Sequence, residues 1–136
     1  MLRDSIVPVL RQYFASHPRR LVAAYLFGSV ARGDERNDSD VDIGVVFGCH
    51  RQLELADLDR CADMQDELAG LLRREVDVVA LDAASPDLQF RVLRDGVLLF
   101  EGDREARVEF EIHVRNEYFD LLPYLTRYRE AVLRRA

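Results

Sequence analysis

The chain contains 136 residues, 49% hydrophobic and 32% charged, a composition that suits one globular domain over residues 1–136 and excludes extended disorder. Its 25 acidic residues outnumber the 19 basic ones, and the net charge of −6 disfavours sequence-independent binding to nucleic acid. Each of those basic residues is an arginine and none is a lysine, so any anion-binding site must use arginine side chains or backbone amides.

Cysteine usage and the length of the apolar runs indicate a protein of the reducing cytoplasm. The two cysteines, Cys49 and Cys61, form no CxxC pair, so neither a disulfide framework nor a cysteine zinc site is indicated. The longest apolar runs, such as residues 21–28, are far too short to span a bilayer. We therefore expect a soluble cytoplasmic protein that has no membrane association.

The first part of the chain predicts a helix followed by two strands. Apolar residues at helical spacing indicate the helix, which ends near residues 17–20; these residues are Ile6, Val9, Leu10 and Tyr13. Residues 21–27 are apolar and predict a buried strand that runs into a tight turn at Gly28-Ser29 and a short helical segment. After the polar residues 32–39, the β-branched residues of segment 41–47 predict a second strand.

The central part of the chain continues this alternation. An amphipathic helix over residues 55–72 is indicated by the spacing of Leu55, Leu58, Ala62, Leu68 and Leu72. Residues 76–81 predict a third strand, residues 85–95 a helix and residues 97–100 a fourth strand. The pattern predicts an α/β (α+β) domain with a small mixed sheet of about four strands flanked by helices.

The C-terminal residues 105–135 are helical in composition, and Pro123 should kink or split this segment near Leu122. An apolar and aromatic stripe recurs near helical spacing along it: Phe110, Val114, Tyr118, Leu121, Leu125, Tyr128 and Val132. Such stripes usually belong to the core, but a sheet this small could leave part of the stripe exposed to contact a partner. The sequence leaves both alternatives open.

Gly28 and Ser29 stand between the first strand and the short helical segment, where backbone N–H groups and a hydroxyl could bind a phosphate. An ordinary tight turn explains the dipeptide equally well. A P-loop is excluded, because Asp34 and Glu35 stand where that motif requires lysine and serine or threonine.

Asp40 and Asp42 flank Val41 at the start of the second strand. Residues two apart in a strand point to the same side, so the two carboxylates share one face while Val41 packs on the other. Two carboxylates this close repel each other unless a cation lies between them, and Mg²⁺ prefers such oxygen ligands. A solvated acidic edge is the alternative for an isolated pair, and a calcium loop fails because Ile43 replaces its glycine and Cys49 its closing glutamate.

Asp77 lies between Val76 and Val78 in an otherwise apolar strand, where burying a carboxylate is costly without a metal or a cationic partner. This makes Asp77 a candidate third metal ligand. A salt bridge to an arginine is the structural alternative. Glu75 would share the face of Asp77, but its place at the start of the strand indicates contact with solvent.

Together these motifs resemble the nucleotidyltransferase superfamily of DNA polymerase β type. More closely, the chain is similar to the minimal nucleotidyltransferases that act as MntA-like antitoxins in HEPN/MNT toxin–antitoxin pairs. The resemblance extends over nearly the whole chain and is carried by residues 27–33, 39–42, 76–79, 92–99 and 118–123.

The resemblance implies a polymerase β-like fold and a role for each motif. Gly28 and Ser29 would hold the phosphates of a nucleoside triphosphate, while Asp40 and Asp42 would bind two Mg²⁺ ions and Asp77 would complete the metal site and help deprotonate the attacking hydroxyl. Arg32 and Arg36 would add charge-assisted contacts to phosphate. The alternative, which holds at least equally for Arg36, is that they are solvated surface arginines paired with Asp34 or Glu35.

The resemblance further implies that the chain transfers AMP from ATP to a tyrosine of a HEPN ribonuclease toxin and so neutralises it. Two other functions stay open at this stage. The chain could act as an antitoxin by stoichiometric binding alone, or it could modify a small molecule of the aminoglycoside type.

Overall fold

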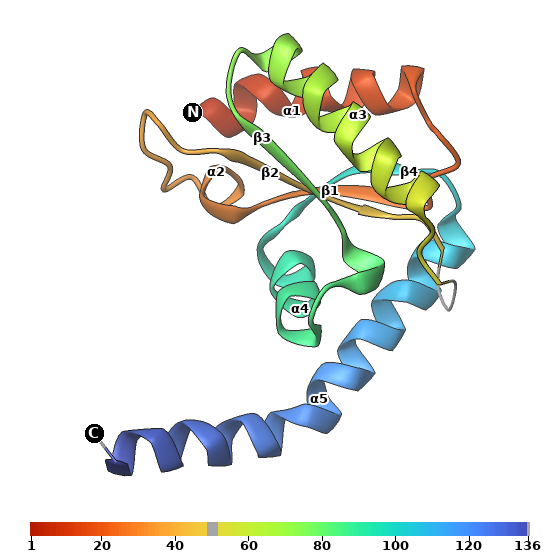
Figure 1. The fold of residues 1–136 in the computed structure, drawn as a ribbon. Helices are drawn as coiled ribbons and strands as arrows, with labels where there is room; N and C mark the ends of the chain where they lie inside the picture. The colour runs from red at the N-terminus through yellow and green to blue at the C-terminus, as the bar shows by residue number, and fades with distance from the viewer. Residues whose placement is uncertain (49–51, 136) are drawn as a thin grey trace.

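A computed structural model describes residues 1–48 and 52–135 of the chain (Figure 1). Over these residues, helices and strands alternate as the sequence predicts. In chain order the elements are α1 (Leu2–Ser16), β1 (Ala23–Phe27), α2 (Gly28–Arg32), β2 (Val41–Val46), α3 (Leu55–Leu72), β3 (Val76–Ala80), a 3-10 turn η1 (Leu81–Ala83), α4 (Pro86–Asp95), β4 (Val97–Glu101) and α5 (Arg104–Arg135).

The described strands form one mixed sheet in the order β3-β2-β1-β4. β1 pairs antiparallel with both β2 and β4, whereas β2 and β3 are parallel. Parallel neighbours need a crossover connection, and α3 provides it between β2 and β3. The prediction of a small mixed sheet of about four strands flanked by helices is confirmed.

Helices cover both faces of the sheet, because alternate residues of the strands are apolar on each side (Figure 1). The cluster on one face joins α1 and α3 to the sheet and includes Leu10, Phe14, Leu26, Ile43, Met64 and Leu68. The cluster on the other face joins α4 and the first part of α5 to the sheet and includes Tyr25, Val46, Leu81, Val92, Phe110 and Val114.

The helix predicted over residues 55–72 is confirmed, but the predicted stripe is buried only toward its C-terminal end, where Leu68 is in the core and Leu72 packs against it. Leu55 is 81% exposed and Leu58 52% exposed. Asp57 is buried instead, because a reciprocal capping box fixes the start of α3: its carboxylate accepts from the backbone N–H of Glu54 at 3.0 Å. The buried side of α3 is formed by Asp57, Cys61, Met64 and Leu68, and Leu55 and Leu58 lie away from it.

Pro123 does not split the C-terminal segment, contrary to one of the two predicted outcomes. α5 continues from Arg104 to Arg135, and its axis changes direction part-way along in Figure 1. Proline lacks the N–H that would bond one turn back, and this loss bends a helix without ending it where the other bonds persist. None of the helices in the described ranges combines the length and apolar character needed to cross a bilayer.

Candidate active site

The β1–α2 junction brings Gly28 against Asp42. Gly28 has a φ of +77°, in the left-handed region that favours glycine. A Cβ atom placed there would lie 3.3 Å from the Cβ of Asp42 and in steric conflict with its carboxylate. The close approach therefore requires glycine, and it places Asp42 next to the start of α2, whose first backbone N–H groups have no acceptor within the helix.

Strand pairing places Asp42 and Asp77 side by side. In the register of the sheet Asp42 lies opposite Phe27 of β1 on one side and Asp77 of β3 on the other. Residues two apart share a face, and Val46 of β2 packs in the cluster beneath α4 and α5. The two carboxylates therefore lie on that same face, beyond the end of the apolar cluster.

The carboxylates of this region influence one another electrostatically. Burial, followed by the nearby charges of Asp77 and Asp40, raises the pKa of Asp42 above its usual value of 3.8, and the Arg32 guanidinium partly opposes that rise. Asp42 is half-buried, while Asp40 and Asp77 are exposed. Asp40, Asp42 and Asp77 therefore lie close enough for their charges to interact, and their assignment as metal ligands remains a prediction.

Asp77 is not buried, and the expectation that its burial demands compensation is wrong. β3 is an edge strand in which Val76 and Val78 point into the core while Asp77 points to solvent. Within the described part of the chain Asp77 forms no ion pair with an arginine, so the salt-bridge alternative finds no support there. Glu75 is exposed as expected, and its backbone carbonyl accepts from the N–H of Val41 at 3.0 Å.

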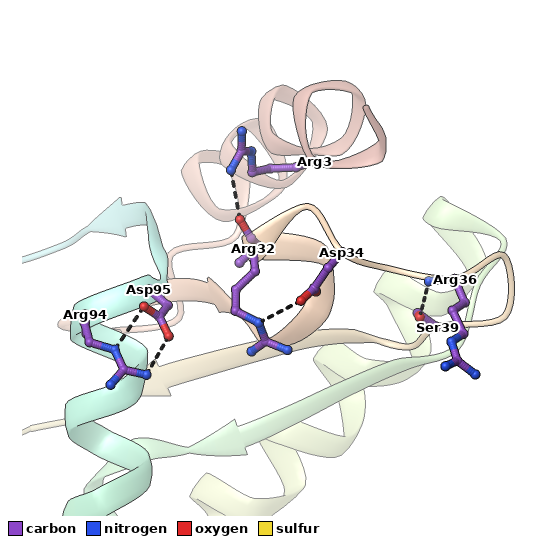
Figure 2. A network of polar contacts seen from close by, with 8 residues as sticks. Arg3, Arg32, Asp34, Arg36, Ser39, Arg94 and Asp95 are labelled. Carbon is purple, nitrogen blue, oxygen red and sulfur yellow. Dashed lines mark hydrogen bonds and ion pairs between the residues drawn. The ribbon is translucent and has the colours of Figure 1, made fainter.

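Arg74 positions the loop that precedes Asp40, a role that sequence reasoning does not identify. Its Nη2 donates to the carbonyl of Asn37 at 2.6 Å, and its Nη1 to that of Ser39 at 3.5 Å. Ser39 Oγ in turn accepts from the backbone N–H of Arg36 at 2.7 Å (Figure 2). The only sequence signal was an arginine two residues before a strand, which is too common to point to this role.

Arg32 projects from the end of α2 between acidic residues of two elements. Figure 2 shows its guanidinium between Asp34, which pairs with Arg32 Nε at 3.4 Å, and the Arg94–Asp95 pair of α4. Arg94 binds Asp95 through two hydrogen bonds of 3.0 and 2.9 Å. Asp34 thus pairs with Arg32, and the predicted contact of Arg32 with phosphate remains a prediction.

The donor set of this region suits a hard divalent cation. Among residues 1–48 and 52–135, no three histidine, cysteine, aspartate or glutamate side chains converge closely enough to hold an ion alone. Mg²⁺ seldom needs such a cage, because it retains water and binds one or two carboxylates together with substrate phosphates. The paired Asp42 and Asp77, with Asp40 nearby, fit that mode of binding.

Comparison with known proteins identifies the family to which this arrangement belongs. Residues 9–105 match the family model described as polymerase beta, nucleotidyltransferase. The chain belongs to this nucleotidyltransferase family. It is also 33% identical over 96 residues to a relative from Methanocaldococcus jannaschii named "putative protein adenylyltransferase", a match that covers 71% of this chain and 91% of the relative.

Solved structures extend the likeness to the whole nucleotidyltransferase chain, including α5. A toxin–antitoxin crystal structure with AMP-PNP contains a chain that is 25% identical, with a TM-score of 0.71 and coverage of 98% of this chain and 99% of that one. An MNT antitoxin in complex with a tri-AMPylated HEPN toxin from Shewanella oneidensis is 23% identical with a TM-score of 0.69, covering 93% and 98% of the two chains. At that lower identity the likeness establishes the fold.

Proposed function

We propose that this nucleotidyltransferase transfers AMP from ATP to a tyrosine hydroxyl of a HEPN ribonuclease toxin and thereby neutralises it as an antitoxin. The observation that carries the proposal is the placement of Asp42 and Asp77 in register on β2 and β3, against Gly28. This arrangement puts a candidate phosphate-binding turn and a pair of candidate metal ligands on one face of the sheet.

The chemistry follows from the roles that we assign to these residues. The hydroxyl oxygen attacks the α-phosphorus of ATP in line with the leaving group, so that an O–P bond forms as the bond between the α-phosphorus and the bridging oxygen breaks. The products are an AMP ester of the acceptor and pyrophosphate, and no covalent enzyme intermediate is needed.

Gly28 and Ser29 bind the β- and γ-phosphates through backbone N–H groups and the Ser29 hydroxyl, and Arg32 adds a charge-assisted contact. Asp77, on the exposed edge strand, orients the incoming hydroxyl and helps to remove its proton. Asp40, Asp42 and Asp77 would hold two Mg²⁺ ions, which when bound lower the pKa of the nucleophile and neutralise the leaving pyrophosphate.

Support for ATP and for a protein acceptor comes from the relatives. The 25% identical structure is a toxin–antitoxin complex with AMP-PNP, an analogue of ATP. The 33% identical relative is named for adenylyl transfer to protein, and the tri-AMPylated partner in the S. oneidensis complex is a HEPN toxin. These statements describe those proteins, and their transfer to this chain is the content of the proposal.

The proposal is tested with purified chain, Mg²⁺, ATP labelled at the α-phosphate, and a HEPN ribonuclease from the same genome. We expect label on the HEPN protein and a parallel loss of its ribonuclease activity. The label should stay on the protein after a mild acid treatment that strips non-covalently bound nucleotide. Asp40→Asn serves as the control, because it removes one candidate ligand from an exposed position and should leave the fold intact.

The same assay separates the alternatives. Neutralisation of the ribonuclease by Asp40→Asn or by Asp42→Asn without labelling would contradict transfer and favour stoichiometric binding. Labelled product in the small-molecule fraction, with an aminoglycoside supplied as acceptor and no label on protein, would contradict the protein acceptor while retaining nucleotidyl transfer.

A further inference from the structure

The C-terminal half of α5 carries an apolar stripe that the fold does not cover. Phe110 and Val114, in the first half, are buried against the sheet. Beyond them, three residues of the predicted stripe are exposed, by 37% at Leu121, 69% at Tyr128 and 48% at Val132, while Leu125 is partly buried. Tyr124, which lies between Leu121 and Tyr128 at helical spacing, is 66% exposed. The spacing of these four exposed residues, which we call the distal stripe, puts them on one side of the helix.

The transition from buried to exposed occurs at an aromatic cluster that ties α5 to α4. The ring of Tyr118 stacks on that of Phe90, with centroids 3.9 Å apart and planes 2° from parallel, and Phe119 meets both rings edge-on. This cluster anchors the middle of α5 against the body. The distal stripe therefore projects from a fixed base, which suits a docking surface because less ordering is needed on binding.

The position of the distal stripe favours a partner that also reaches the active site. α4 and α5 cover the same face of the sheet that carries Asp42 and Asp77. In Figure 1 the C-terminal half of α5 extends past α4 toward the side of the molecule on which α2 and the start of β2 lie. A protein held on the stripe would thus lie on the active-site side of the molecule.

The charge of the distal half of α5 indicates which kind of partner surface it would bind. Residues 121–135 contain four arginines and one acidic residue, although the whole chain has a net charge of −6. One of these arginines, Arg127, lies over the ring of Tyr124 at 6.0 Å from its centroid. Packing the stripes of two copies against each other would bring these arginines together, so a second copy is disfavoured at this surface and an acidic partner is favoured.

We infer that the distal stripe, Leu121, Tyr124, Tyr128 and Val132, docks the protein acceptor through an apolar groove rimmed by acidic residues and holds it beside the catalytic carboxylates. This inference rests on the proposed function, because it takes the HEPN ribonuclease as the acceptor. Exposed tyrosines flanked by arginines are the residue types that most often dominate the energy of such interfaces.

The test uses the full chain and the double variant Tyr124→Ala/Tyr128→Ala. Its matched control is Leu55→Ala/Leu58→Ala, which removes two exposed apolar side chains from α3 on the opposite face of the sheet. The probe is a HEPN ribonuclease from the same genome, inactivated at its ribonuclease site, and binding is measured by calorimetry. AMP-PNP affinity and the thermal midpoint are measured for each variant in parallel.

We expect the tyrosine variant to bind the HEPN protein about tenfold or more weakly, since truncating interface tyrosines is costly, with AMP-PNP affinity and thermal midpoint unchanged. The leucine variant should bind like the wild type, and the wild-type affinity should weaken with added salt because opposite charges attract across the surface. Equal binding by the tyrosine and wild-type chains would overturn the inference.

Two further outcomes would also overturn it. The first is a wild-type dimer that the tyrosine variant dissociates in light scattering, which would assign the stripe to a second copy. The second is a wild-type chain that does not bind the HEPN protein. Failure of the proposed function looks different: the stripe-dependent binding would persist, but no label from ATP would reach the bound protein.

Discussion

Asp42 of β2 lies directly opposite Asp77 of β3 in a parallel register. Opposed carboxylates on neighbouring strands destabilise a sheet through like-charge repulsion. Gly28 lies close to the same carboxylate, with which a Cβ atom at that position would collide. Two opposed carboxylates lower the stability of the folded chain when no cation lies between them. Such local conflicts are typical of functional sites, here one that would bind a cation.

Replacing Asp42 with asparagine should remove nucleotidyl transfer while preserving the fold. We expect a loss of at least about a hundredfold in rate, because metal-borne stabilisation of phosphoryl transfer is worth several kcal/mol. Labelled-ATP kinetics measures the loss, and circular dichroism checks the fold. Activity within a factor of two of the wild type would refute the assignment of Asp42 as a ligand.

The same variant should be at least as stable as the wild type when metal is chelated. The pKa of Asp42 is raised by burial and by Asp77 and Asp40, so the folded state binds its proton more tightly than the unfolded state does. Protonation of Asp42 therefore contributes stability at low pH, and this contribution is lost as the pH rises from 3.8 through the folded-state pKa of Asp42. In urea denaturation with EDTA, the free energy of unfolding of the wild type should therefore fall relative to that of Asp42→Asn as the pH increases over that range. A fall in the stability of the variant relative to the wild type would contradict the raised pKa of Asp42.

Gly28→Ala should both destabilise the protein and reduce transfer. A positive φ and the contact with the Asp42 carboxylate together oppose any side chain, at a cost of about 1–2 kcal/mol from the backbone conformation alone. Gly70→Ala in α3 is the matched control: nothing lies within 4 Å of its Cβ position, and alanine there should stabilise the helix by about 0.5–1 kcal/mol. Opposite signs in urea denaturation are expected, and equal signs would count against the constrained turn.

Arg32→Gln should weaken ATP binding by about three- to tenfold, the loss of one partly exposed charge-assisted contact. Because the Arg32 guanidinium lowers the pKa of Asp42, its removal should also move the acidic limb of the activity profile to higher pH. Arg36→Gln provides the comparison, since Arg36 is exposed on the next loop and has no part in the shift of Asp42. Identical profiles for the two variants would remove Arg32 from the site.

Glu67 joins α3 to the end of α1, away from the active site. It accepts a hydrogen bond from the Tyr13 hydroxyl and two of 2.7 Å from Arg19, and these contacts, led by that of Tyr13, lower the pKa of Glu67 below its usual 4.5. Glu67→Gln should cost about 1 kcal/mol, a value kept small because the carboxylate is 45% exposed and screened by solvent. The cost should be present at neutral pH and vanish as the pH falls below 4.5 through the folded-state value.

Urea denaturation at several pH values measures this effect, with the neighbouring exposed Asp66→Asn as control. AMP transfer by Glu67→Gln should match that of the wild type at temperatures where both are folded. A loss of transfer without a loss of stability would mean that the Tyr13–Glu67 contact reaches the active site, which the fold does not indicate.

The sequence by itself determined the elements and the chemical types at the site. Short apolar runs predicted the four strands, and apolar residues at helical spacing predicted the helices between them. Both patterns are local, because burying one side of a strand or helix sets the spacing of its apolar residues. Gly28-Ser29 and the Asp40–Asp42 pair stood out for a related reason: a turn residue and closely spaced charges interrupt apolar runs, and only function or exposure explains them.

Only the tertiary structure decided which of these residues meet. The parallel pairing of β2 with β3, formed through α3, sets Asp42 beside Asp77, which are 35 positions apart in the sequence. The edge position of β3 exposes Asp77, the packing of α3 on the sheet leaves Leu55 exposed, and a bent but continuous α5 leaves the distal stripe uncovered. These features depend on contacts between segments far apart in the chain. The spacing of apolar residues in the sequence describes each segment by itself and does not show which segments meet.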